Sequence, residues 1–234
     1  MTGPHKSTTF VGGNRPLLIT DCDEVLLHMV AHFRDWVGER HAIDFALHTG
    51  EFSGALTHRD DGRVVDETQV WPLLESFFTT EMARQTLVPG AGEALQRIAE
   101  VADIVVLTNI GEHGHAGRVA QLADHGIHHR VRCNQGGKGP PALALIDELR
   151  PSVTVFVDDL PVHHASMAKH APFVWRLHMI AEPEMAPGVP PARHAHARID
   201  DWAEATDWIM ARFDEGLAAS RALTSDPSPA NART

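Results

Sequence analysis

The segment Leu17–Leu27, LLITDCDEVLL, constrains the fold of this chain more than any other segment does. Its apolar run ends in two acids, Asp21 and Asp23, which one residue separates, and apolar residues resume at Val25. This pattern is typical of a buried central strand that delivers carboxylates to the edge of a parallel sheet, where open α/β folds bind ligands. Two acids so close together in a core would repel each other and lose their hydration, so a bound cation is the simplest explanation. The alternative is that the acids only cap the next helix.

Beyond this segment, helical patterns alternate with short apolar segments. The helical patterns cover residues 26–40, 71–79, 81–85, 91–101, 117–124, 140–149 and 200–213. The segments that indicate strands cover residues 16–20, 104–107, a few residues near 131, 153–157 and 173–177. Such alternation predicts a doubly wound, Rossmann-like parallel α/β sheet with right-handed crossovers.

One connection in this pattern is unusually long. About sixty residues separate the first predicted strand from the next regular core element, far more than a crossover needs. We therefore predict an inserted, mostly helical cap over residues 29–88 and a core domain formed by residues 15–28 and 89–215. The polar ends, residues 1–14 and 216–234, are expected to be flexible.

Polar residues follow three of the predicted strands at the point where each strand ends. They are Asp21 with Asp23, Thr108 with Asn109, and Asp158 with Asp159. Carboxyl ends of parallel strands share one edge, so we expect these groups to converge, which capping alone does not predict. Several carboxylates in an open site suit Mg²⁺, whose coordination a substrate phosphate commonly completes. Thr108 and Lys138, which follows a Gly-Gly turn, are then candidate phosphate ligands, and a carboxylate beside them can attack phosphorus.

The order Asp-x-Asp, strand-Thr-Asn, Lys, strand-Asp-Asp resembles the four motifs of the haloacid dehalogenase-like (HAD) superfamily. The resemblance covers about residues 16–28 and 89–177, whereas the cap matches only in location and predicted helicity. It implies a magnesium-dependent phosphatase that forms an aspartyl-phosphate. Asp21 would be the nucleophile and a magnesium ligand. Asp23 would protonate the leaving oxygen and later activate water, while its backbone carbonyl contacts the metal.

The resemblance also implies roles for the remaining motif residues. Thr108 and the backbone amide of Asn109 would bind the phosphoryl oxygens. Lys138 would balance their charge and orient the nucleophile. Asp159 would ligate magnesium directly, with Asp158 in a supporting or water-mediated role.

Two positions refine the comparison with the superfamily. The dehalogenases of the superfamily usually lack the second aspartate, so Asp23 favours phosphoryl transfer. Glu24 stands where the superfamily commonly has glycine, and it either alters the turn after the nucleophile or adds charge near the site.

Other functions are consistent with part of the pattern. A phosphomutase would use the same aspartyl-phosphate, and an inactive descendant would bind a phosphorylated ligand without turnover. Receiver domains also combine acids, Thr and Lys, but their acid pair comes first in the chain, whereas Asp158 and Asp159 come last. The segment GGKGPP around Lys138 does not match the GxxxxGK[ST] pattern of a P-loop.

The charge of the chain bears on its partners. The formal net charge of −11 would repel nucleic acid and anionic membranes, so we expect a small phosphorylated metabolite as the partner. The two cysteines, Cys22 and Cys133, form neither a zinc motif nor a disulfide framework, and no signal-like apolar run is present. We therefore expect a cytoplasmic protein. The apolar faces of the cap helices are consistent with a homodimer.

The chain has seventeen histidines, which we interpret as surface residues because they are scattered and lack metal-ligand spacing. The segment GEHGHAGR, 111–118, begins two residues after Asn109 and is either an ordinary loop entering a helix or a substrate contact through His113, His115 or Arg118. Candidate contacts from the cap are His48, His58, Arg59 and Trp71.

Overall fold

The computed structural model describes residues 15–46, 52 and 54–219 and is built around a six-stranded parallel sheet in the order β10-β9-β8-β1-β6-β7. The strands are β1 (Leu17–Thr20), β6 (Asp103–Thr108), β7 (Arg130–Cys133), β8 (Thr154–Asp158), β9 (Trp175–His178) and β10 (Ala197–Arg198). β1 lies at the centre, where Ile19 is in register with Val105 of β6 and Phe156 of β8. Its four residues are all buried, as the apolar run in the sequence requires.

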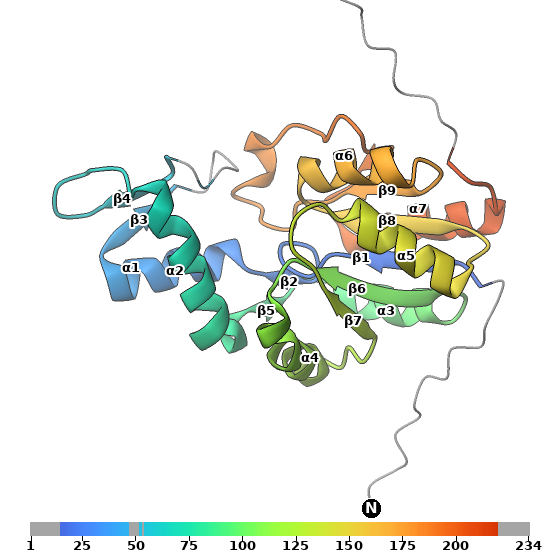
Figure 1. Ribbon diagram of the computed structural model, residues 1–234, viewed down its shortest axis with the longest axis horizontal. Helices are drawn as coiled ribbons and strands as arrows, with labels where there is room; N and C mark the ends of the chain where they lie inside the picture. The colour runs from blue at the N-terminus through green and yellow to red at the C-terminus, as the bar shows by residue number, and fades with distance from the viewer. Residues whose placement is uncertain (1–14, 47–51, 53, 220–234) are drawn as a thin grey trace, which may run out of the picture.

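Helices cover both faces of the sheet (Figure 1). They are α3 (Ala91–Ala99), α4 (His115–Asp124), α5 (Gly139–Leu149), α6 (Pro161–His170) and α7 (Trp202–Glu215). Because side chains alternate along a strand, Leu18 packs with α3 and α7 on one face, and Leu17 and Ile19 pack with α5 and α6 on the other. The predicted doubly wound α/β architecture is therefore confirmed.

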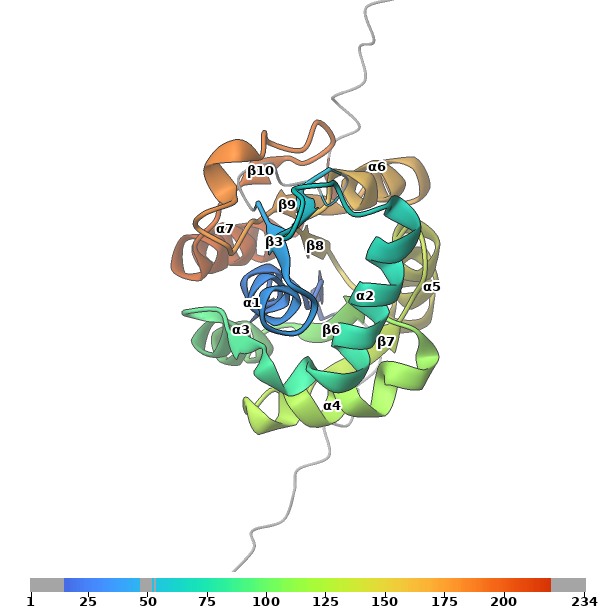
Figure 2. The ribbon, with the colours of Figure 1, turned by 90° about the vertical axis from the view of Figure 1, so that its left-hand side faces the viewer.

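The long connection after β1 forms a separate lobe, which we call the insert, residues 29–85. It contains α1 (Val30–His41), β3 (Ile43–Phe45), β4 (Leu56–His58), α2 (Glu67–Thr80) and the 3-10 turn η2 (Met82–Arg84). Its chain leaves through β2 (Leu27–His28) and returns through β5 (Thr86–Leu87), which pair antiparallel. The insert lies beyond the carboxyl end of β1 (Figures 1 and 2).

The insert has a hydrophobic core of its own, centred on Phe33. The Phe33 ring packs edge-on against Phe45 and Phe77, with ring centroids 5.8 and 5.6 Å apart. Ile180 and Met185, from the loop after β9, complete this cluster. The sheet domain therefore contributes side chains to the core of the insert, and the division into domains at residues 28/29 and 88/89 stays a prediction.

Several local expectations differ from the observed elements. The helix predicted from residue 26 begins at Val30, because Leu27 and His28 pair with β5. Residues 81–85 form a single 3-10 turn, η2, rather than a helix. The antiparallel pair β3–β4 was not predicted, because strands of three residues are too short to show an alternating pattern.

α6 and β10 were also absent from the sequence prediction. α6 has the sequence PVHHASMAKH, and its buried face consists of His163, His164 and Met167. A helix that buries histidines shows no apolar stripe, so its period is invisible in a hydrophobicity pattern. Two further 3-10 turns, η3 (Glu112–Gly114) and η4 (Ala186–Gly188), lie in connections.

The chain ends predicted to be flexible fall mostly on residues 1–14 and 220–234, which lie outside the described residues. Within the described part, the backbone oxygen of Leu217 accepts a hydrogen bond from the Trp175 indole, and the Ala219 amide donates to the Phe173 oxygen. No helix in the described part of the chain is both long and apolar enough to cross a membrane.

Candidate active site

The centre of the site is a buried lysine held between two carboxylates. Lys138 lies at the start of α5 and has no solvent exposure. Its Nζ is 2.6 Å from Oδ1 of Asp21, which follows β1, and 2.7 Å from Oδ2 of Asp158, which ends β8. Burial alone would lower the pKa of Lys138, but Asp158 and Asp21 raise it above its ordinary value, so the ammonium stays charged.

The acids after β8 differ in what they contact. Asp158 uses both oxygens, because Oδ2 accepts from Lys138 and Oδ1 accepts from the Leu160 amide at 2.9 Å. Asp159 is buried, with 8% exposure, and none of the described residues donates a hydrogen bond to its carboxylate. Asp159 therefore has free oxygen atoms that could bind a cation, whereas both oxygens of Asp158 already accept hydrogen bonds.

The carboxylates of Asp21, Asp158 and Asp159 form a cluster whose ligand atoms lie within 4.8 Å of one another. Burial raises the pKa of Asp21, and burial together with Asp158 raises the pKa of Asp159 well above its usual range. When all three acids are ionised, they and the Lys138 ammonium together carry a charge of −2, which a divalent cation would neutralise. An oxygen-only donor set of this kind fits Mg²⁺.

Asp23 lies beside this cluster in a different environment. Nη2 of Arg118 donates to both of its carboxylate oxygens, at 2.8 and 2.9 Å. Nε2 of Gln85 donates to Oδ1 at 2.7 Å, and Oγ1 of Thr108 donates to Oδ2 at 3.5 Å. Asp23 is thus oriented by Arg118 of α4, by Gln85 at the end of the insert and by Thr108 at the end of β6. Its side chain is 15% exposed, whereas that of Arg118 has no exposure.

Arg118 is fully buried, and its guanidinium holds Asp23. Burial acts against its charged form, but Asp23 raises the pKa of the guanidinium above its ordinary value. Nη1 also donates to Gln121 at 3.0 Å and to the Cys22 sulfur at 3.2 Å. From the sequence, Arg118 is expected only as a substrate contact and Gln85 is not expected at the site, because no local pattern links either residue to Asp23.

The Thr108–Asn109 pair at the carboxyl end of β6 lies beside Asp23. Thr108 is fully buried at the end of β6, whereas Asn109 is exposed. The Asn109 side chain donates to the Gly136 oxygen at 2.9 Å and accepts from Asn134 at 3.0 Å. These bonds tie the loop after β6 to the loop that carries Lys138, which holds the backbone amide of Asn109 in place.

The expectation that the histidines are surface residues is wrong for three of them. His163, His164 and His178 are all buried. His164 Nε2 donates to the Asp158 backbone oxygen at 3.0 Å, and His178 Nε2 donates to the Asp159 oxygen at 2.8 Å. Two histidines therefore fix the backbone that carries the acids after β8, a role in which burial rather than exposure is required.

These histidines predict a pH dependence of stability. Burial lowers the pKa of His164 from 6.5 to about 3. Between these values the unfolded chain binds more protons than the folded chain, so stability falls as pH falls, by up to about 1.4 kcal/mol per pH unit for one group. His164→Gln, whose amide can replace the donor, is expected to flatten the pH dependence of urea unfolding between pH 6.5 and 5. A slope equal to that of the wild type would contradict this role.

Glu24 is buried and adopts a left-handed backbone conformation, with φ of 58°. This conformation explains why glycine is common here in the superfamily that the motifs resemble. The Glu24 carboxylate Oε1 accepts from the amides of Met29 and Val30 at the start of α1. Burial raises the pKa of Glu24 to about 7, against the effect of these two amides. The left-handed turn after Asp23 therefore forms with glutamate at this position. The Glu24 carboxylate links this loop to the start of α1 in the insert.

Among the described residues, the other candidate substrate contacts form no hydrogen bond or ion pair with this cluster. His113 is exposed, and His115 contacts the Val131 oxygen at 3.2 Å. In the insert, Arg59 pairs with Asp44. The indole of Trp71 is 74% exposed, and His58 lies in β4, whereas His48 lies outside the described residues. Their contact with substrate stays a prediction.

No protein-family model and no curated protein matches the sequence. Solved structures do match. A haloacid dehalogenase-like family hydrolase from Streptococcus pneumoniae has a TM-score of 0.57 at 8% identity, covering 84% of this chain and 98% of that one. A proposed HAD hydrolase from Bacillus subtilis bound to magnesium has a TM-score of 0.58 at 13% identity, covering 84% and 99%. A proposed β-phosphoglucomutase from Thermotoga maritima has a TM-score of 0.53 at 14% identity, covering 84% and 99%.

These likenesses extend over nearly the whole length of each matched chain. The four motifs noted in the sequence lie at the carboxyl ends of β1, β6 and β8 and at the start of α5. The chain has the fold of the haloacid dehalogenase-like hydrolases.

Proposed function

We propose that the protein is a magnesium-dependent phosphatase that hydrolyses a small phosphorylated metabolite through an aspartyl-phosphate on Asp21. The observation that carries this proposal is that Asp21 and Asp23 lie close together in the chain but contact different residues. Asp21 touches the buried Lys138 ammonium, whereas Asp23, two residues later, is oriented by Arg118 and reaches Thr108. These different environments support Asp21 as the nucleophile and Asp23 as the residue that moves a proton.

In the first step, an oxygen of Asp21 attacks the phosphorus, and the bond to the leaving oxygen breaks. Lys138 and the Asn109 amide stabilise negative charge on the phosphoryl oxygens, and Thr108 adds a hydroxyl donor. Asp23 in its protonated form gives its proton to the leaving oxygen. In the second step, the Asp23 carboxylate takes a proton from water, which attacks phosphorus and releases Asp21 and phosphate.

Asp21 and Asp159, together with the Asp23 carbonyl, would hold Mg²⁺, with Asp158 supporting them. When bound, Mg²⁺ supplies charge neutralisation for the phosphoryl group. The protein side of this arrangement is set by Lys138, whose ammonium lies between the carboxylates of Asp21 and Asp158 and contacts both. The magnesium named for the related Bacillus subtilis structure supports the choice of metal.

The proposed substrate is a small metabolite in the cytoplasm. The net charge of −11 disfavours polyanionic nucleic acid, and the insert lies beyond the carboxyl end of β1, the end at which the site lies. Cys22 and Cys133 are both buried and free, as expected in a reducing compartment.

The test is a panel of phosphorylated metabolites incubated with the protein and Mg²⁺. We expect free phosphate to be released from at least one member and the reaction to stop when EDTA removes the metal. The likeness to a β-phosphoglucomutase favours a second candidate, a phosphomutase. That activity would give an isomerised sugar phosphate without stoichiometric phosphate release. Binding of phosphorylated compounds without any turnover would contradict both activities.

A further inference from the structure

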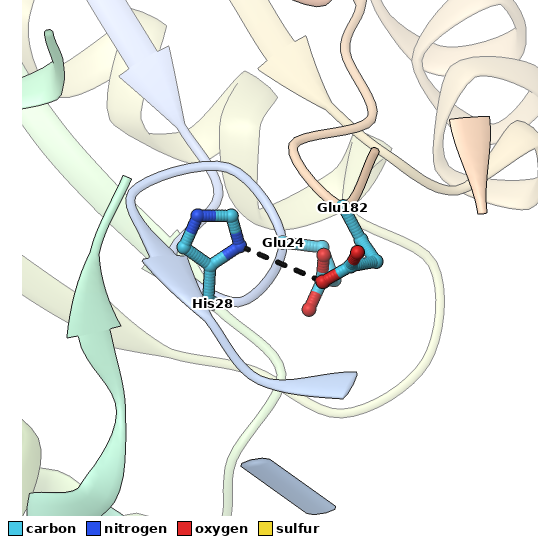
Figure 3. A group of neighbouring side chains, drawn as sticks. All are labelled: Glu24, His28 and Glu182. Atoms are coloured by element: carbon cyan, nitrogen blue, oxygen red, sulfur yellow. Dashed lines mark ion pairs between the residues drawn. The ribbon is translucent and has the colours of Figure 1, made fainter. Parts of the chain in front are cut away.

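A second group of metal-ligand side chains lies where the core meets the insert (Figure 3). Glu24 comes from the loop after β1, His28 from β2, and Glu182 from the segment after β9. Their ligand atoms lie within 4.8 Å of one another. The two carboxylates and the imidazole point toward one another, and none of the three belongs to the Asp21, Asp158 and Asp159 cluster.

Each carboxylate in this group has one oxygen held by the backbone. Oε1 of Glu24 accepts from the Met29 and Val30 amides at 2.7 and 2.6 Å. Oε1 of Glu182 accepts from the Glu184 amide at 3.0 Å. These bonds orient both carboxylates and leave the second oxygen of each available, as backbone donors commonly do for metal ligands.

The available atoms are buried. Glu24 is 1% exposed and Glu182 is 6% exposed. Oε2 of Glu24 and Nδ1 of His28 are buried with no hydrogen-bond partner among the described residues. Oε2 of Glu182 lies 4.0 Å from that Nδ1, too far for a hydrogen bond. Buried polar atoms are normally satisfied, so two orphans in one group, facing a second carboxylate, indicate a missing ligand.

The chemistry of the three groups selects the ligand. As metal ligands, two carboxylates and one imidazole carry a charge of −2, so a divalent cation balances them. An imidazole nitrogen among the donors favours Zn²⁺ over Mg²⁺, which prefers oxygen. Bonds of about 2.1 Å place ligand atoms about 3 to 4.2 Å apart, depending on their angle at the ion. The 4.0 Å separation of His28 and Glu182 falls within that range.

We propose that Glu24, His28 and Glu182 bind a divalent transition-metal cation, such as Zn²⁺, at a site separate from the catalytic centre. The cation links the loop after the nucleophile, the first strand leading into the insert and the segment after β9. It thereby holds the insert in position relative to the sheet. This proposal does not depend on the proposed phosphatase activity, because it uses none of the residues assigned to the reaction.

The test is zinc content after dialysis. The full chain is stripped with EDTA, dialysed against micromolar Zn²⁺ and analysed for zinc per chain. We expect Glu182→Gln and His28→Gln each to bind one zinc ion fewer than the wild type. Glu184→Gln is the matched control, because Glu184 is two residues away and its side chain is 65% exposed, and it is expected to keep the wild-type content.

Thermal unfolding provides a second readout that also reports folding of each variant. Zn²⁺ is expected to raise the midpoint of the wild type and of Glu184→Gln more than that of Glu182→Gln or His28→Gln. Glutamine can still accept the hydrogen bond from the Glu184 amide, so Glu182→Gln is expected to fold. If Glu24 and Glu182 instead share a proton, both variants will keep the zinc content of the wild type, and that result would overturn the proposal.

Discussion

Replacing Asp21 with Asn is expected to lower kcat for an aryl phosphate such as p-nitrophenyl phosphate by about 10⁴-fold or more. A neutral amide cannot attack phosphorus, so the aspartyl-phosphate cannot form. The fold is expected to persist, because Lys138 keeps its 2.7 Å contact with Asp158. The measurement is nitrophenolate release with saturating Mg²⁺, together with circular dichroism of the variant.

Asp147→Asn is the matched control for this change. Asp147 lies on α5 and is exposed, so the same chemical substitution is expected to leave kcat unchanged. A second readout is acid-stable labelling of the protein by ³²P-phosphorylated substrate, expected in the wild type and absent from Asp21→Asn. Activity near the wild-type value in Asp21→Asn would exclude Asp21 as the nucleophile.

Replacing Lys138 with Met is expected to destabilise the protein by about 3–5 kcal/mol and to remove activity. The Lys138 ammonium is fully buried, with Asp21 and Asp158 at 2.6 and 2.7 Å. Without it, two buried carboxylates face each other with no cation between them, and the phosphoryl oxygens lose their positive partner. Urea unfolding in EDTA measures the loss of stability without help from a metal.

Lys169→Met is the control for Lys138→Met, because Lys169 is exposed on α6. It is expected to change the free energy of unfolding little. The double variant Lys138→Met/Asp158→Asn removes one of the two stranded acids, so it is expected to recover part of the lost stability without recovering activity. Equal stability of Lys138→Met and the wild type would show that the ion pairs do not support the fold.

The sheet was predictable from the sequence for a physical reason. Strands β1, β6 and β8 are buried on both faces, so each is an apolar run that ends where polar residues begin. The parallel arrangement then brings Asp21, Thr108 and Asp158 to one edge whatever the details of packing. The insert was predictable as an overlong connection, but its short β3–β4 pair was not.

The residues that contact the site residues were harder to predict from the sequence. The sequence pattern predicts that His164 and His178 lie on the surface, whereas both are buried and donate to the backbone oxygens of Asp158 and Asp159. The sequence does not show whether a histidine is buried, because its side chain is stable both in water and in a core that provides hydrogen-bond partners for its nitrogens. α6, which buries two such histidines, was missed for the same reason.

By itself, the sequence determined which residues stand at the ends of the central strands, because hydrophobic period and chain order are local properties. The tertiary structure alone decided what each acid contacts. Asp23 is held by Gln85 and Arg118, which lie 62 and 95 positions away along the chain. It also decided that Glu24 would face His28 and Glu182. Such contacts depend on how the insert and α4 pack against the sheet, and no local pattern of residues records that packing.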